Sequence, residues 1–151
     1  MIARNSCFAH YTDGYFSEND WFTSWLGASP PENGGIKLHV SAAPHFAEIV
    51  ARSVLPKLRD LKIHHKVCKN LQLYLELNKL NEGKQGGKFI TIYTGGQAQM
   101  QLVVNAIDRE LVWMGVVRGP VPTTRDSNHG LEETSVGRSG LIFSRLYNKG
   151  D

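Results

Sequence analysis

The feature that most constrains the fold is the run GIKLHVS at residues 35–41, in which apolar and polar side chains alternate. A β-strand directs successive side chains to opposite faces, so the alternation predicts one apolar face and one face carrying Lys37, His39 and Ser41. The first face would belong to a core and the second to a small polar site. The same run is also typical of an edge strand in a half-solvated antiparallel sheet whose polar face has no function, because exposed Lys and His are common.

The size of the chain limits its organisation. Its 151 residues and hydrophobic content of 41% predict one globular domain with a proper core and leave no room for a second. No stretch approaches the roughly 18 to 20 apolar residues of a membrane span, and the first residues do not lead into a signal-peptide run. We therefore expect a soluble, cytoplasmic protein.

Charge and cysteine content exclude two further classes. The net charge of +3 suits an anionic ligand but falls short of the concentrated basic stripe of a nucleic-acid-binding protein. Cys7 and Cys68 lie far apart without C-x-x-C spacing, which argues against a metal framework, so we expect free thiols. The five histidines other than His39 show no metal-ligand spacing, and we interpret them as structural or surface residues.

Strand-like and helical segments alternate along the chain and indicate an α+β or α/β domain. Of these we predict α+β, a single domain with a small, mostly antiparallel sheet and helices packed on it. Residues 1–34 form an aromatic-rich arm that would pack on the domain at 35–151 or form part of a peptide groove. Pro56 predicts a kink or break in the first helix. Residues 112–117 fit either one more strand or the end of a helix. The predicted elements are strands at 36–41, 62–68, 89–93 and 141–147, helices at 44–61, 71–80 and 102–111, and a long loop at 119–139.

Cationic residues recur at strand ends and in Gly-rich loops, and acidic residues are sparse beside the strand lysines. A solvated charged face explains any one of these cations, but as a group they favour an anion-binding site. The turn beside Lys84 and Lys88 lacks the spacing of a P-loop. The cations are Lys37, Lys66, Lys84, Lys88, Arg125, Arg138 and Arg145.

Six short motifs, taken in order, carry a resemblance to a known family. They are IKLHVS at 36–41, VLPKL at 54–58, HKV at 65–67, GGKFITIY at 86–93, GP at 119–120 and SGLIFSRLY at 139–147. Together they resemble the phosphothreonine lyase family, and most of all the phosphoserine/phosphothreonine lyase domain of class III and IV lanthionine synthetases. Secreted phosphothreonine lyase effectors of pathogenic bacteria belong to the same group. The resemblance covers about residues 35–147.

The resemblance implies a metal-free β-elimination without a cofactor. Lys66 would be the general base that removes the Cα proton, and His39 the general acid that protonates the departing phosphate. Lys37 and Arg145 would bind the phosphate, and Tyr93 would line the site. A cation-rich site suits this chemistry, because a lysine acts as a base near neutral pH only if its pKa is lowered, as neighbouring positive charges do.

The sequence departs from the family in the loop before the strand at 89–93. The family usually has an Arg there, whereas this chain has Glu82-Gly83-Lys84. Lys84 can take its place, but it lacks the bidentate fork of Arg, which puts phosphate affinity or substrate choice in question. Arg138 and Arg125 are further candidates for phosphate binding.

The expected partner is a phosphorylated peptide or protein, which would yield dehydroalanine or dehydrobutyrine. One setting is a lanthipeptide-type pathway in which a separate Ser/Thr kinase acts first. Another is an effector that is secreted into a host cell and inactivates a host kinase. A non-catalytic phosphopeptide-binding module stays open because of the departure at residues 82–84. An RNA-binding domain is disfavoured, since aromatic residues do not interleave with the basic ones.

Overall fold

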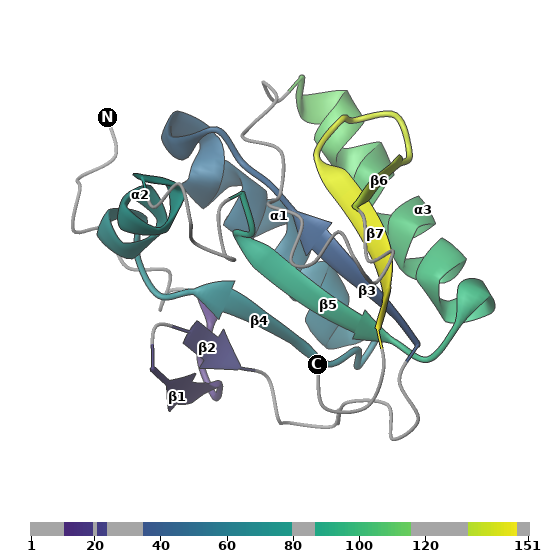
Figure 1. Ribbon diagram of the computed structural model, residues 1–151, viewed down its shortest axis with the longest axis horizontal. Helices are drawn as coiled ribbons and strands as arrows, with labels where there is room; N and C mark the ends of the chain where they lie inside the picture. Colours follow the sequence, from purple (N-terminus) through teal and green to yellow (C-terminus); the bar gives the residue numbers. More distant parts are fainter. Residues whose placement is uncertain (1–10, 20, 24–34, 80–86, 116–132, 148–151) are drawn as a thin grey trace, which may run out of the picture.

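The computed structural model describes residues 11–19, 21–23, 35–79, 87–115 and 133–147. In these residues a seven-stranded, fully antiparallel sheet has the strand order β1-β2-β4-β5-β3-β7-β6 and packs with three α-helices (Figure 1). The expected α+β architecture is confirmed. Within the described part, no helix combines the length and apolar character needed to cross a membrane. The strands are β1 (Phe16–Glu18), β2 (Trp21–Thr23), β3 (Gly35–Val40), β4 (His65–Cys68), β5 (Ile90–Thr94), β6 (Thr134–Val136) and β7 (Ile142–Tyr147), and the helices are α1 (Ala47–Asp60), α2 (Leu71–Lys79) and α3 (Gln97–Met114).

Strand β3, which contains the alternating run, lies inside the sheet between β5 and β7. Its apolar residues Leu38 and Val40 are fully buried in the hydrophobic core, which residues of α1 and α3 share. Figure 1 shows α1 passing behind the central strands and α3 lying beside them. The interpretation of this run as a solvated edge strand is therefore wrong.

Helices α1 and α3 both differ from their predicted extents. Helix α1 is preceded by a 3₁₀ turn at Pro44–Phe46 and runs through Pro56 without a break. The predicted break is wrong because Pro56 and Arg52, whose carbonyl would otherwise bond to residue 56, are both exposed, so that this carbonyl can meet water. Helix α3 extends to Met114 and ends at Gly115, whose φ of 63° closes the last turn. Residues 112–114 are thus the helix end.

Strand β4 is shorter than the strand predicted at 62–68. Its start is set by the end of α1, where Lys62 adopts a φ of 56° and its N–H donates to the Arg59 carbonyl. The predicted division of its side chains is confirmed by the pairing with β5, which places His65 opposite Ile92 and Lys66 opposite Thr91.

Three short strands lie where none was predicted. Strands β1 and β2 form a hairpin within the N-terminal arm, and β2 extends the sheet by pairing with β4. Strand β6 lies within the predicted loop at 119–139 and forms the other edge. Three-residue strands are too short to show a period-2 pattern. The boundary at residue 34 falls outside the described residues and stays a prediction.

The turn between β6 and β7 is attached to α3 through Asp108. Its carboxylate accepts hydrogen bonds from the N–H groups of Arg138 (2.7 Å) and Ser139 (3.0 Å). Gly137 has a φ of 77°, and a Cβ there would lie 2.6 Å from the Asp108 carboxyl carbon, so this position favours glycine on both counts. The attachment fixes β6, and residue 133 just before it, beside β7.

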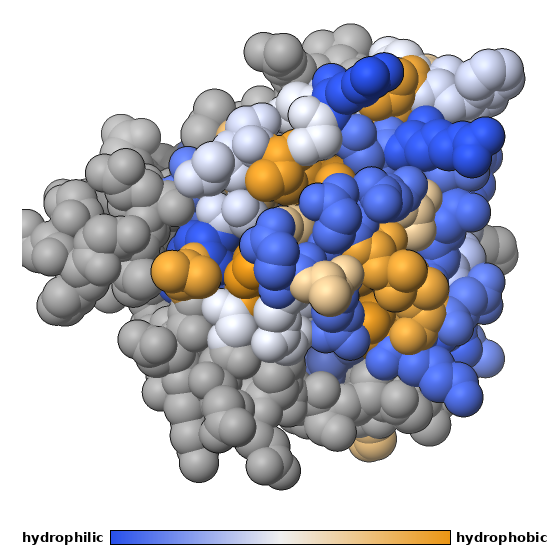
Figure 2. Space-filling model, turned by 90° about the vertical axis from the view of Figure 1, so that its right-hand side faces the viewer, coloured by the Kyte–Doolittle hydropathy of each residue, from blue (hydrophilic) through white to orange (hydrophobic). Residues whose placement is uncertain are grey.

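The outer side of α3 faces the viewer in Figure 2, where apolar patches interrupt a hydrophilic surface. The exposed large apolar residues of this helix are Leu102, Val112 and Trp113.

Candidate active site

Three polar side chains form a row across the middle of the sheet. Thr91 of β5 pairs with Lys66 of β4 on one side and with His39 of β3 on the other. Directly paired residues share a face, and neighbouring strands lie about 4.8 Å apart. The Lys66 and His39 backbones are therefore about 10 Å apart, a distance that the long lysine side chain and the imidazole ring can bridge above the short side chain of Thr91.

A second row on the same face carries two cations. Lys37, two residues before His39 on β3, pairs with Tyr93 of β5 and with Arg145 of β7. The Lys37 Nζ lies 5.3 Å from the centroid of the Tyr93 ring. Lys37 and Arg145 are only 6% and 4% exposed. Two positive charges in so buried a place favour an anion as ligand.

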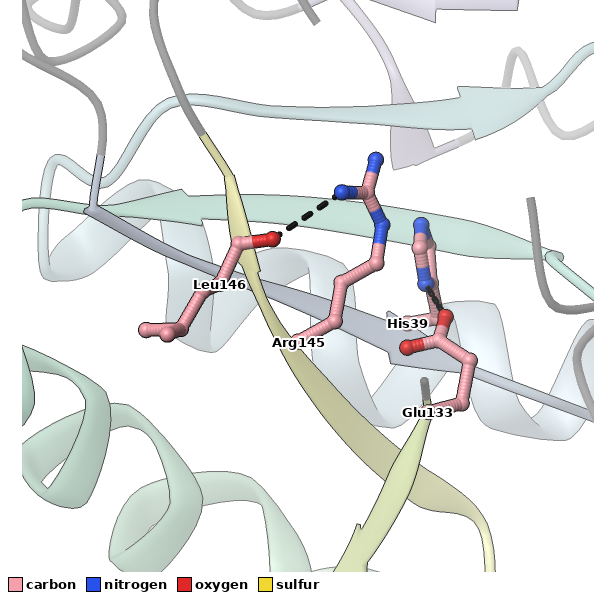
Figure 3. Close-up of polar contacts among 4 residues, drawn as sticks. All are labelled: His39, Glu133, Arg145 and Leu146. Carbon is pink, nitrogen blue, oxygen red and sulfur yellow. Dashed lines mark hydrogen bonds and ion pairs between the residues drawn. The ribbon is translucent and has the colours of Figure 1, made fainter. Parts of the chain in front are cut away.

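Glu133, just before β6, holds the imidazole of His39. Its Oε1 contacts His39 Nδ1, and both side chains are almost completely buried (Figure 3). Burial lowers the pKa of His39 to about 4, the Glu133 carboxylate opposes this shift, and the Lys88 and Lys37 ammonium groups add to it. Because Glu133 occupies Nδ1, proton exchange with a substrate would take place at Nε2.

Arg145 is oriented by its own strand. Its Nη1 donates a hydrogen bond of 3.0 Å to the carbonyl oxygen of Leu146. Figure 3 shows that the Arg145 guanidinium and the His39 ring extend to the same side of the sheet. The guanidinium therefore lies where it can contact an anion bound next to His39.

The N-terminal hairpin brings an aromatic ring to Lys66. The Lys66 Nζ lies 4.5 Å from the centroid of the Trp21 ring, a cation–π distance worth about 0.5–1 kcal/mol at an exposed site. Trp21 lies on β2, next to β4, so the arm contributes directly to the surroundings of Lys66.

The structure brings together five of the seven predicted site residues: Lys66, His39, Lys37, Tyr93 and Arg145. Arg138 is exposed, and its N–H is bound by Asp108 of α3, on the helix side of the sheet. The structure does not bring Arg138 to the cluster. Lys84 and Arg125 lie outside the described residues.

Four residues near the site were not among the predicted site residues. Thr91 could have been found, because it is two residues before Tyr93 and shares its face. Lys88 was counted only as one of several cations. Glu133 and Trp21 lie on or beside three-residue strands that the sequence pattern does not reveal. The described residues contain no group of three or more His, Cys, Asp or Glu side chains that could hold a metal ion.

Comparison with known proteins adds a family and a fold. The model of the family described as RamC, N-terminal domain, matches residues 8–121. A search of curated proteins finds no match. The structure resembles the phosphothreonine lyase SpvC, an effector protein from Salmonella, with a TM-score of 0.58 and 10% identity over 97% of this chain and 81% of that one. It also resembles the type III effector and phosphothreonine lyase OspF from Shigella flexneri, with a TM-score of 0.53 and 13% identity over 96% and 80% of the two chains.

These comparisons confirm part of the resemblance stated from the sequence. The fold is that of phosphothreonine lyases, although at such low identity the likeness concerns the fold alone. The link to lanthionine synthetases stays a prediction. The family model covers more than half of the sequence, and the chain therefore belongs to the family of the RamC N-terminal domain.

Proposed function

We propose that the protein is a phosphothreonine or phosphoserine lyase. It would eliminate phosphate from a phosphorylated peptide and leave dehydrobutyrine or dehydroalanine, without a metal or another cofactor. Lys66 Nζ removes the Cα proton, the electron pair forms the Cα–Cβ double bond, and the Cβ–O bond breaks. A proton from His39 Nε2 goes to the departing phosphate. The observation that carries this proposal is the row Lys66–Thr91–His39, with Lys37 and Arg145 beside it.

The row supports elimination because the two proton-transferring groups approach from opposite sides. A base at the Cα proton and an acid at the ester oxygen must act on atoms separated only by Cβ. Lys66 and His39 lie on either side of one short residue, so that both can reach such a group at the same time. Lys37 and Arg145 would bind the phosphate and stabilise the charge that develops as the Cβ–O bond breaks.

The protonation state of His39 follows from its surroundings. With a pKa of about 4, its imidazole is neutral near pH 7 in the free protein. A bound phosphate dianion would raise this pKa, since an opposite charge nearby favours the protonated ring. A phosphomonoester also has a second pKa near 6, so the substrate itself can bring the proton. Substrate binding thus supplies His39 with the proton that it later transfers.

The setting that we propose is lanthipeptide-type peptide biosynthesis after a separate Ser/Thr kinase. What supports this setting is the resemblance of the sequence motifs to the lyase domain of lanthionine synthetases, whereas the likeness to the two effectors is one of fold. An effector that inactivates host kinases is the alternative, since both neighbours are described as effectors. Comparing a short unstructured phosphopeptide with a folded, phosphorylated kinase as substrates separates the two settings. We expect the short peptide to react well.

Intact-mass spectrometry of a phosphothreonine peptide incubated with the protein and EDTA tests the activity. Elimination removes about 98 Da and hydrolysis about 80 Da, which follows from the composition of the phosphate ester. We expect a loss of about 98 Da that disappears in Lys66→Ala. A peptide of unchanged mass that still binds would overturn the enzyme and leave a phosphopeptide-binding module. Matched phosphoserine and phosphothreonine peptides give the preference.

A further inference from the structure

The hydroxyl group of Thr91 is a buried polar group in the middle of the row that joins Lys66 and His39. Thr91 is 2% exposed, and its Oγ1 is buried and has no hydrogen-bond partner in the part of the chain that the structure describes. A buried hydroxyl without a partner destabilises a protein by about 1–3 kcal/mol, and such groups in native structures call for an explanation. The position of Thr91, between His39 and Lys66, supplies one.

We infer that Thr91 Oγ1 donates a hydrogen bond to the phosphoryl group of the bound substrate. This inference rests on the proposed function and adds a substrate-binding residue to it. If Lys66 acts at Cα and His39 at the ester oxygen, the atoms between them lie directly above Thr91. A phosphate ester offers several oxygen acceptors there, and a threonine hydroxyl can rotate its hydrogen toward any of them.

The other strand residues on this face fit such an arrangement. Thr91 has the shortest side chain in its row and lies between the two longer side chains of Lys66 and His39. Lys37 and Tyr93 lie in the adjacent row and provide a cation and an aromatic wall. A hydrogen bond from a neutral hydroxyl to a charged phosphate is stronger than one between neutral groups.

Thr94, on the same strand, provides a matched control. It is also fully buried, but its Oγ1 donates a hydrogen bond of 2.7 Å to the carbonyl oxygen of Ile36. It pairs with Ile36 on the face opposite Thr91. The two threonines thus share a strand and a degree of burial and differ in whether the hydroxyl has a partner in the described protein.

The test compares Thr91→Val, Thr91→Ser and Thr94→Val by elimination kinetics and thermal unfolding. We expect Thr91→Val to lower kcat/KM about 10- to 100-fold, the scale of one hydrogen bond to a charged group. Its melting temperature should stay the same or rise, since valine removes a buried hydroxyl without changing the shape. Thr91→Ser, which keeps the hydroxyl, should stay within about fivefold of the wild type. Thr94→Val should show the opposite pattern, a lower melting temperature with elimination unchanged.

A binding measurement separates this inference from the proposed function. In the Lys66→Ala background the phosphopeptide would bind without reacting, and Thr91→Val should weaken that binding. Inorganic phosphate should raise the melting temperature of the wild type and raise it less in Thr91→Val. If the wild type binds phosphate but eliminates nothing, the lyase proposal fails, and a weaker phosphate effect in Thr91→Val still supports the role of Thr91.

Two results would overturn the role of Thr91. One is a Thr91→Val variant with wild-type kcat/KM and an unchanged response to phosphate. The other is a Thr91→Ser variant as impaired as Thr91→Val, because the shape of the side chain rather than its hydroxyl would then matter.

Discussion

Two buried histidines lie on opposite faces of the same sheet and differ in what surrounds them. His39 on β3 is 2% exposed and His65 on β4 is fully buried. Burial lowers the pKa of each to about 4, so both rings are neutral near pH 7. Their opposite faces follow from the pairing of His39 with Thr91 and of His65 with Ile92, two residues that differ by one position along β5.

His65 is held by neutral partners on both nitrogens. Its Nδ1 donates a hydrogen bond of 2.7 Å to the carbonyl oxygen of Ile63, and its Nε2 then accepts from the Tyr15 hydroxyl. Burial raises the pKa of that hydroxyl, opposed by the charge of Arg59, so Tyr15 keeps its proton. Both ring nitrogens are thus engaged in hydrogen bonds within the protein. The ring connects the segment before β1 to the sheet.

His39 has a carboxylate on one nitrogen and cations around it. The Glu133 carboxylate favours a protonated ring, whereas burial, Lys88 and Lys37 favour a neutral one. An arriving anion changes this balance, because it adds negative charge and offsets the cations. The comparison teaches that similar burial and a similar pKa do not make two histidines equivalent, because the charged partners of His39 allow a bound anion to change its protonation and the hydrogen-bond partners of His65 are neutral.

The largest expected effect comes from His39→Asn. Asparagine keeps a donor toward Glu133 but has no proton to transfer, so we expect elimination to fall by about 10²- to 10⁴-fold, the usual contribution of a general acid. The rate is measured by mass spectrometry of a phosphothreonine peptide, with thermal unfolding as the control for folding. A variant that keeps the wild-type rate would contradict the proposed role of His39 as the proton donor.

Acid should destabilise the protein through both histidines. Each has a pKa of about 4 in the folded chain, below the ordinary value of 6.5, so the unfolded chain binds more protons between these two pH values. The contribution of the two neutral histidines to the free energy of unfolding is therefore complete above about pH 6.5. It is lost as the pH decreases to about 4, by on the order of 3 kcal/mol per histidine.

Urea unfolding across this pH range measures the effect of acid. Replacing His65 with Asn should remove part of the pH dependence, because its titration no longer contributes. Inorganic phosphate should reduce the part of the stability loss that comes from His39 and leave the part from His65 unchanged. A free energy of unfolding that does not change between pH 6.5 and 4 would contradict neutral, buried histidines in the folded chain.

Glu133→Gln should lower elimination about 10- to 100-fold, less than the loss of the imidazole itself. The amide oxygen can still accept from Nδ1–H, so the ring orientation is kept while the negative charge that favours the protonated ring is lost. Elimination by Glu133→Gln should recover partly at lower pH, where protonation is easier. An unchanged pH profile for this variant would show that Glu133 acts only by holding the ring.

The smallest expected effect comes from Tyr15→Phe on the other face. It leaves His65 Nε2 without the tyrosine hydroxyl and should lower the free energy of unfolding by about 1–2 kcal/mol. Elimination should stay within about twofold of the wild type once the protein is folded. A large loss of activity without a loss of stability would mean that His65 and Tyr15 take part in the reaction.

Alternation along the strands was enough to predict one face of the site. That Lys37 and His39 share one face of their strand, and that Lys66 lies on the opposite face of its strand from His65, depends only on the two-residue period of a strand. The order of these strands in the sheet was not predictable from alternation, since no local pattern specifies that β5 lies between β3 and β4.

Contacts between distant, short elements account for what the sequence did not predict. Glu133 contacts His39 across 94 positions of the sequence, from just before a three-residue strand within an expected loop. Arg138, a predicted phosphate-binding residue, lies away from the cluster, because the turn at Gly137 brings its N–H to the carboxylate of Asp108 on α3. Trp21 contacts Lys66 from a hairpin whose strands are too short to show a two-residue alternation of apolar and polar side chains.

The most direct test of the central claim is the fate of the Cα hydrogen. A phosphothreonine peptide with deuterium at Cα is incubated with the wild type and followed by intact mass. The account predicts that deuterium leaves together with phosphate, a loss of about 99 Da in place of the loss of about 98 Da from the undeuterated peptide. It also predicts that neither the deuterated nor the undeuterated peptide reacts with Lys66→Ala. A loss of about 80 Da with the deuterium retained would show hydrolysis at phosphorus and contradict the roles of Lys66 and His39.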